Sequence, residues 1–138
     1  MLLEKKKVCS INKIIDFIVI NEEVNNNYKD IECSYSNNKY SFKIENDFFN
    51  ITVDNKKVLF VKENDNSILK LELINNKKND GTYYIKQLDS IIDVKAESIF
   101  QNILKDKIEV KYKLWLQDEY TGEFCFKILL KEWKNGRH

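Results

Sequence analysis

Apolar side chains occupy every second position in successive segments of this chain, most clearly near its C-terminal end. Two runs carry the pattern: residues 108–116 and residues 124–130. In the first run the intervening residues are mainly lysine and glutamate. A period of two places alternate side chains on opposite faces of a strand, so that one face is buried and the other is solvated. The pattern therefore predicts an antiparallel sheet, and it carries little information about chemistry.

Clusters rich in asparagine, aspartate and glycine divide the chain at short intervals, and such residues tolerate turn conformations. Strands are expected between the clusters, at about 11–22, 28–36, 39–45, 48–53, 57–63, 67–75, 82–88, 90–98, 108–118 and 123–133. The length of 138 residues suits one domain. Short strands joined by hairpin-length loops predict an all-β fold, a single antiparallel barrel of about 8–10 strands that spans residues 1–138.

Residues 96–105 depart from the strict alternation. Apolar residues recur there at helical spacing, at Ala96, Ile99, Phe100, Ile103 and Leu104. This spacing predicts one short helix packed on an end of the barrel. The alternative is that the same residues continue the preceding strand through a bulge.

The alternation also assigns bulky side chains to the barrel interior. We expect these inward residues to be Tyr40, Phe42, Ile44, Phe49, Ile51, Val53, Leu69, Leu71, Leu73, Tyr112, Leu114, Phe124, Phe126 and Ile128. Tyr112 and Phe126 lie at the centres of unbroken runs, so their burial is the sharpest expectation. A small barrel is just wide enough to be filled by side chains or to hold one small ligand. The number of rings favours a filled interior.

If one end of the barrel is open, aromatic residues are the candidates to line a ligand pocket. These candidates are Tyr35, Tyr40, Phe42, Phe60, Tyr112 and Phe124. Rings that flank a few hydroxyl groups form the apolar wall with sparse polar anchors that small-molecule sites require. The leading hypothesis is a non-enzymatic barrel that binds a small apolar or amphipathic ligand, or a protein partner.

A second candidate surface lies on the predicted outer face, where Trp115, Trp133 and Leu129 stand among lysines. A partner subunit or the N-terminal segment would cover this surface, or the rings would lie flat under lysine stems. Lys111 and Lys113 with Trp115 also suit single-stranded nucleic acid, the alternative function. The chain has 23 basic and 22 acidic residues. This near balance disfavours nucleic-acid binding.

Catalytic templates are largely missing from the sequence. The only histidine is His138, the last residue, and the three glycines are too scattered for a phosphate-binding loop. Carboxylate pairs at Asp89 and Asp93, and at Asp118 and Glu119, leave an enzyme as a second alternative. We assign no catalytic residue, cofactor or metal.

The three cysteines, Cys9, Cys33 and Cys125, are far apart and odd in number. Neither a disulfide framework nor a zinc site has this spacing, so buried or half-buried thiols are expected. The N-terminal lysines followed by an apolar run resemble a signal peptide, but Asp16 interrupts the run and no cleavage site follows. We therefore expect a first strand, no membrane segment and a cytoplasmic location. The abundance of Asn, Lys and Ile indicates an adenine- and thymine-rich bacterial genome.

The order of elements across residues 48–132 is distinctive. A strand with a tight turn at 51–61 is followed by a strand at 68–74, a loop into 81–85, the run 91–103, the strand 108–114 and a final amphipathic strand. This order resembles the bacterial YwiB family of small lipocalin-like barrels, whose function is unknown. The resemblance implies a calycin-type barrel without an established activity. The family's arginine-and-glycine turn is replaced by residues 62–65 here, so a binding role of that arginine does not carry over.

Overall fold

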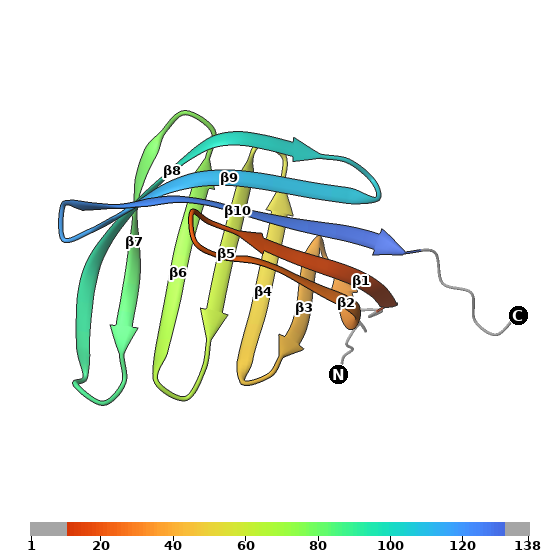
Figure 1. Ribbon diagram of the computed structural model, residues 1–138, viewed down its shortest axis with the longest axis horizontal. Coiled ribbons are helices and arrows are strands. Elements are labelled where there is room, and N and C mark those ends of the chain that lie inside the picture. Colours follow the sequence, from red (N-terminus) through yellow and green to blue (C-terminus); the bar gives the residue numbers. More distant parts are fainter. Residues whose placement is uncertain (1–10, 132–138) are drawn as a thin grey trace, which may run out of the picture.

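The computed structural model describes residues 11–131, which form ten β-strands and no helix (Figure 1). The strands are β1 (Ile11–Ile20), β2 (Asn25–Ser36), β3 (Lys39–Ile44), β4 (Asp47–Asp54), β5 (Lys57–Glu63), β6 (Ser67–Ile74), β7 (Lys78–Ile85), β8 (Ser90–Ile103), β9 (Lys107–Leu116) and β10 (Glu119–Lys131). Within these residues there is accordingly no helix long and apolar enough to cross a membrane. The segment that resembles a signal peptide forms β1 in its described part.

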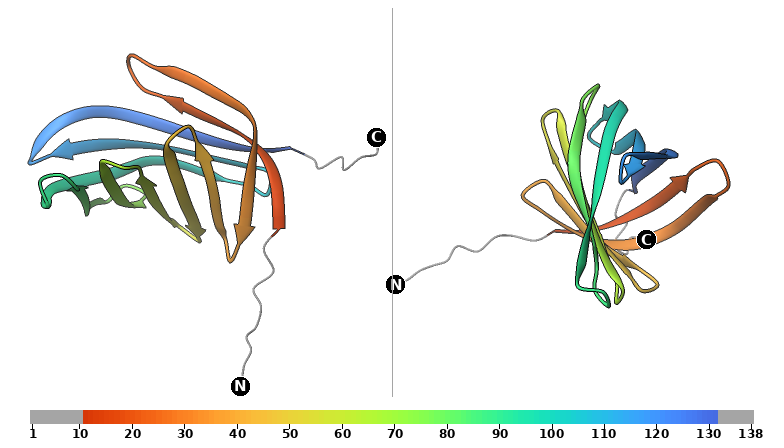
Figure 2. Two further views of the ribbon diagram at one scale, coloured as in Figure 1. Left: turned by 90° about the horizontal axis from the view of Figure 1, so that it is seen from below. Right: turned by 90° about the vertical axis from the view of Figure 1, so that its left-hand side faces the viewer.

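Each strand pairs antiparallel with the next along the chain, and β1 also pairs with β10. The sheet is thus a closed up-and-down barrel, and the prediction of an all-β antiparallel barrel is confirmed. Figure 1 shows β3 to β7 running steeply behind β9, β10, β1 and β2, which cross them in front. The end view in Figure 2 shows the same two layers. Closure removes the exposed sheet edges at which strands of other chains would add.

The inward-facing side chains form one core, as the alternation predicts. Tyr112 is 7% exposed and Phe126 is 2% exposed, so the expected burial of both is confirmed. Phe17, which the alternation analysis did not assign to the interior, lies at the centre of this core. Its ring centroid is 4.8 Å from that of Phe42 and 5.0 Å from that of Phe49. The middle of the barrel is therefore filled by aromatic rings in contact.

The predicted helix at residues 96–105 is wrong. Strand β8 continues to Ile103, which pairs with Ile108 of β9, and the register shifts between Ser98 and Phe100. A bulge of this kind inserts one residue and switches the face on which later side chains lie. Ala96 is therefore buried before the shift, and Ile103 packs against the same core after it. The change of phase produces apolar spacings that imitate the period of a helix.

Strands β6 and β7 pair over only part of their length, from Ser67 opposite Ile85 to Lys70 opposite Thr82. Beyond this point a side chain of β8 bridges to β6. The side-chain amide nitrogen of Gln101 donates a hydrogen bond of 2.9 Å to the backbone carbonyl oxygen of Leu73. The barrel therefore remains closed where the strand ladder is interrupted.

Candidate functional site

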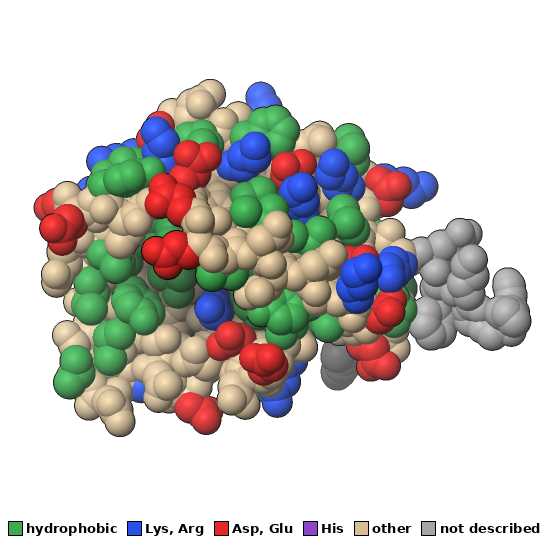
Figure 3. Space-filling view, viewed as in Figure 1, with side chains coloured by type: hydrophobic (Ala, Val, Ile, Leu, Met, Phe, Trp, Pro, Cys, Tyr) green, Lys and Arg blue, Asp and Glu red, His purple; other side chains and the backbone are tan. Residues whose placement is uncertain are grey.

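One end of the barrel contains an open cavity. This end is formed by the turns that follow β1, β3, β5, β7 and β9. An inner recess of about 230 Å³ reaches the aromatic core, and an outer recess of about 280 Å³ lies beside it. Both recesses are lined by Lys62, Leu69 and Leu114, so they adjoin each other. We call these two adjoining recesses the barrel mouth. Figure 3 shows a hollow on the face viewed in Figure 1, with hydrophobic side chains within it and to its left and acidic side chains above and below it.

The inner recess is walled mainly by aromatic rings. Its ring-bearing residues are Phe17, Phe49, Phe60, Tyr112, Phe124 and Phe126. The rings of Tyr112 and Phe124 stack with their centroids 5.6 Å apart, and those of Phe60 and Phe126 stack at 5.3 Å. These contacts hold the rings in place from behind. The recess therefore has a firm apolar floor.

Of the six aromatic pocket candidates, the structure brings Phe60, Tyr112 and Phe124 together at the inner recess. Phe42 packs behind them, stacked on Phe49 at 5.1 Å. Tyr35 and Tyr40 contact each other at 4.7 Å near the opposite end of the barrel, away from the mouth.

Burial perturbs the phenols of this interior. It raises the pKa of Tyr40 to about 12, with smaller contributions from Tyr35 and Cys33. Burial also raises the pKa of Tyr112. Both phenols are therefore neutral near pH 7, so neither offers a negative charge to a ligand.

One row of inward-facing residues crosses four strands at the mouth. Phe49 lies opposite Lys62, Lys62 lies opposite Leu69, and Leu69 lies opposite Tyr83. Sequence reasoning included Lys62 in the expected strand 57–63 but did not assign it to the inner wall. The signal is present in the alternation, because Lys62 follows Phe60 by two residues and β5 extends through Glu63. Two further polar side chains, Asn64 and Ser67, line the outer recess beside this row.

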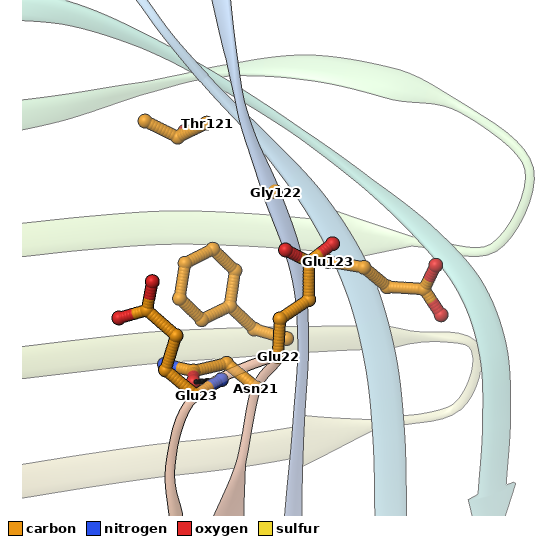
Figure 4. A pocket seen from close by; sticks show the side chains of 7 residues that line it. Asn21, Glu22, Glu23, Thr121, Gly122 and Glu123 are labelled. Carbon is orange, nitrogen blue, oxygen red and sulfur yellow. Dashed lines mark hydrogen bonds between the residues drawn. The ribbon is translucent and has the colours of Figure 1, made fainter.

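The β1–β2 turn forms part of the rim of the mouth. Asn21 lines the inner recess, and its side-chain oxygen accepts hydrogen bonds from the backbone amides of Glu23 and Val24 at 2.8 and 2.7 Å. Glu22 and Glu23 lie near Glu123 of β10 around a further hollow, which shares Asn21 and Phe124 with the inner recess (Figure 4). Within residues 11–131, no group of three or more acidic, histidine or cysteine side chains is placed to hold a metal ion.

The predicted outer surface is only partly described. Trp115 is half-buried, with the Lys78 ammonium 3.9 Å from its ring centroid and the Tyr120 ring 5.5 Å away. Leu129 is also half-buried and lies opposite Asp16 and Lys107. Trp133 lies outside the described residues. Trp115 is therefore covered in part by a lysine stem and a neighbouring ring.

The basic stripe on β9 is flanked by acidic side chains. Lys113 lies opposite Glu97 on β8 and Glu123 on β10, while Lys111 lies opposite Phe100 and Cys125. These carboxylates offset the positive charge that a nucleic-acid backbone requires.

One residue of each carboxylate pair lies in a turn, whereas Asp93 lies in β8 and Glu119 begins β10. Asp89 is in the β7–β8 turn, where its side chain accepts a hydrogen bond of 2.7 Å from the Tyr84 hydroxyl. Asp118 is in the β9–β10 turn and pairs with Lys95 at 3.7 Å. Neither residue lines the mouth.

Comparison with known proteins supports the fold. No protein-family model matches the sequence, and no curated protein matches it. The structure is similar to the crystal structure of the YwiB protein from Bacillus subtilis, with a TM-score of 0.54 and 9% sequence identity. The likeness covers 89% of this chain and 92% of YwiB. At this identity it concerns the fold alone. The expected resemblance to YwiB is thus confirmed for the barrel, and this chain is similar to YwiB in fold over most of the length of both proteins.

Proposed function

We propose that this barrel binds a small apolar or amphipathic molecule in its mouth and does not transform it. The observation that carries the proposal is the pair of adjoining recesses at one end, the inner one lined by aromatic rings and the outer one by leucines and several polar side chains. Small-molecule sites combine a mostly apolar lining with a few polar groups that orient the ligand. The barrel mouth has this composition, because Phe60, Tyr112 and Phe124 form its floor while Asn64 and Ser67 stand near its entrance.

The size of the mouth limits the ligand. Drug-sized sites usually enclose about 300–1,000 Å³. Each recess is smaller than that range, so the ligand should be small, such as a molecule of one or two fused rings or a short alkyl chain. The filled core behind the mouth prevents a longer ligand from passing through the barrel.

A fluorescent apolar probe, N-phenylnaphthylamine, tests this proposal. The probe should bind the native protein with increased emission, because the ring-lined recess excludes water from it. Replacement Leu69→Trp places a larger ring where the two recesses join and should weaken binding at least tenfold. The matched control is Leu59→Trp on the outer face of β5, where Leu59 is 38% exposed; its affinity should equal that of the wild type.

Each variant should first be shown to be folded by its circular dichroism and unfolding transition. Absence of probe binding to the wild type would contradict the proposal. Equal binding by the wild type and a folded Leu69→Trp variant would contradict it as well, because the probe would then sit elsewhere on the surface.

A further inference from the structure

Lys62 is the one charged side chain that lines either recess of the barrel mouth within the described residues. It projects from the inner face of β5, between Phe49 on β4 and Leu69 on β6. Its other neighbours across the mouth, Leu114 and Phe124, are apolar. A positive charge on a wall that is otherwise uncharged requires an explanation, because a lysine usually extends into water from the outer face of a sheet.

The internal partners of Lys62 are weak. Its ammonium lies 3.9 Å from Asp47 Oδ2, which exceeds the length of a good charge-assisted hydrogen bond. The other carboxylate oxygen of Asp47 accepts a hydrogen bond of 2.9 Å from the Asn64 amide. The Phe49 ring centroid is 6.0 Å from the ammonium, at the outer limit for a cation–π contact. The side chain of Lys62 is 41% exposed, so the ammonium is accessible from the mouth.

A second hydrogen-bond donor faces the same space. Tyr83 lies on the same inward row as Lys62, two strands away, and lines the outer recess. Within residues 11–131 its hydroxyl has no hydrogen-bond partner. Lys62 and Tyr83 therefore flank Leu69 on the inner wall, two strand spacings of about 4.8 Å apart.

We infer that the barrel mouth selects a singly charged anionic amphiphile over a neutral one. The inference rests on the function proposed above. The apolar part of this amphiphile would lie on Phe60 and Phe124 in the inner recess. Lys62 would hold its anionic group at the junction of the recesses. A single lysine suits a single negative charge.

The acidic residues around the mouth further restrict which anions can bind there. Glu22, Glu23 and Glu123 surround the neighbouring hollow and do not line either recess of the mouth. They would repel an extended polyanion that reached past the rim.

Two fluorescent probes with the same aromatic skeleton provide the test. Anilinonaphthalene sulfonate carries one negative charge, and N-phenylnaphthylamine is its neutral counterpart. Replacement Lys62→Gln should raise the Kd of the sulfonate probe about fivefold and leave that of the neutral probe unchanged, because only the anion loses a partner. Lys62→Arg keeps the positive charge and should restore the affinity for the sulfonate.

The control variant is Lys70→Gln, which removes an exposed lysine from the outer face of β6. It should leave both affinities unchanged. If a folded Lys62→Gln variant binds both probes as the wild type does, or if Lys70→Gln weakens the sulfonate equally, charge selection by Lys62 is refuted. The neutral probe would still report binding in the mouth in those cases. The inference can therefore fail while the proposed function stands.

Discussion

The carboxylate of Asp16 accepts a hydrogen bond of 3.0 Å from the backbone amide of Asp30, at the place where the pairing of β1 with β2 is irregular. Ile15 lies opposite Ile31, and Phe17 lies opposite Tyr28, so β2 contains an extra residue between these pairs. Asp30 takes a positive φ of 57° there. The Lys131 ammonium lies 3.2 Å from Asp16 and 2.7 Å from Asp30. One buried carboxylate thus fixes the bend of the hairpin whose tip forms part of the mouth rim.

Replacement Asp16→Asn should lower the free energy of unfolding by about 1 kcal/mol at neutral pH, because the bulge loses a charge-assisted hydrogen bond and its ion pair with Lys131. Burial alone would raise the pKa of Asp16, but the Asp30 amide and the Lys131 ammonium outweigh it and lower that pKa below 3.8. A carboxyl group with a lowered pKa stabilises the fold above its unfolded value, and this contribution is lost as pH falls through the folded value.

Urea unfolding from neutral pH to below pH 3.8 measures this effect. The stability difference between wild type and Asp16→Asn should shrink on acidification. The exposed Asp106→Asn variant is the control and should follow the wild type at every pH. A difference between wild type and Asp16→Asn that persists unchanged at the lowest pH would be inconsistent with a charged Asp16.

Replacement Phe126→Ala should cost about 3–5 kcal/mol of stability, as deletions of large buried rings do. Phe126 is 2% exposed, and its ring contacts those of Phe17, Phe60 and Tyr112. Phe48 is 52% exposed on the outer face of β4, so Phe48→Ala removes the same ring at little cost. Chemical denaturation measures both variants. Similar losses in the two would show that the inner and outer faces have been assigned wrongly.

The sequence pattern predicts the barrel because alternating apolar residues show which face of each strand is buried. Tyr112 and Phe126 are examples, since each lies in a run without a break. The pattern misleads where a bulge changes the phase, as at Ser98, where it imitates a helix. The pattern also does not predict that one end of the barrel is open while aromatic rings fill its middle.

The candidate site was predicted in part for the same reason. Phe60, Tyr112 and Phe124 line the inner recess, whereas Tyr35 and Tyr40 lie near the other end of the barrel. Alternation assigns a face to each of these residues, but it does not give the height along the barrel axis. Lys62 was missed because only apolar residues were assigned to the interior, although its position in β5 places it on the inner wall.

Replacement Gly81→Ala should lower stability by about 1–3 kcal/mol, because it inserts a methyl group where β7 passes over β6. A Cβ at position 81 would lie 2.5 Å from the carbonyl oxygen of Lys70 and 3.1 Å from a methyl carbon of Leu71. The neighbouring Thr82 is exposed, so Thr82→Ala serves as a control with a smaller expected loss. Thermal unfolding compares the two variants, and a Gly81→Ala variant as stable as the wild type would contradict this close approach of the strands.

The buried thiols should react slowly in the native state. Cys33 is 3% exposed, and burial raises its pKa to about 11, so almost all of it is protonated at pH 8. Cys125 is 8% exposed, and burial raises its pKa as well.

Cys9 lies outside the described residues, so the measurement uses a Cys9→Ser background. A thiol-specific chromogenic reagent at pH 8 should then modify native protein far more slowly than urea-unfolded protein, because only the thiolate attacks the reagent. Raising the pH toward 11 should accelerate modification of Cys33 while the protein stays folded. Equal rates for native and unfolded protein at pH 8 would mean that neither thiol is protected by the barrel.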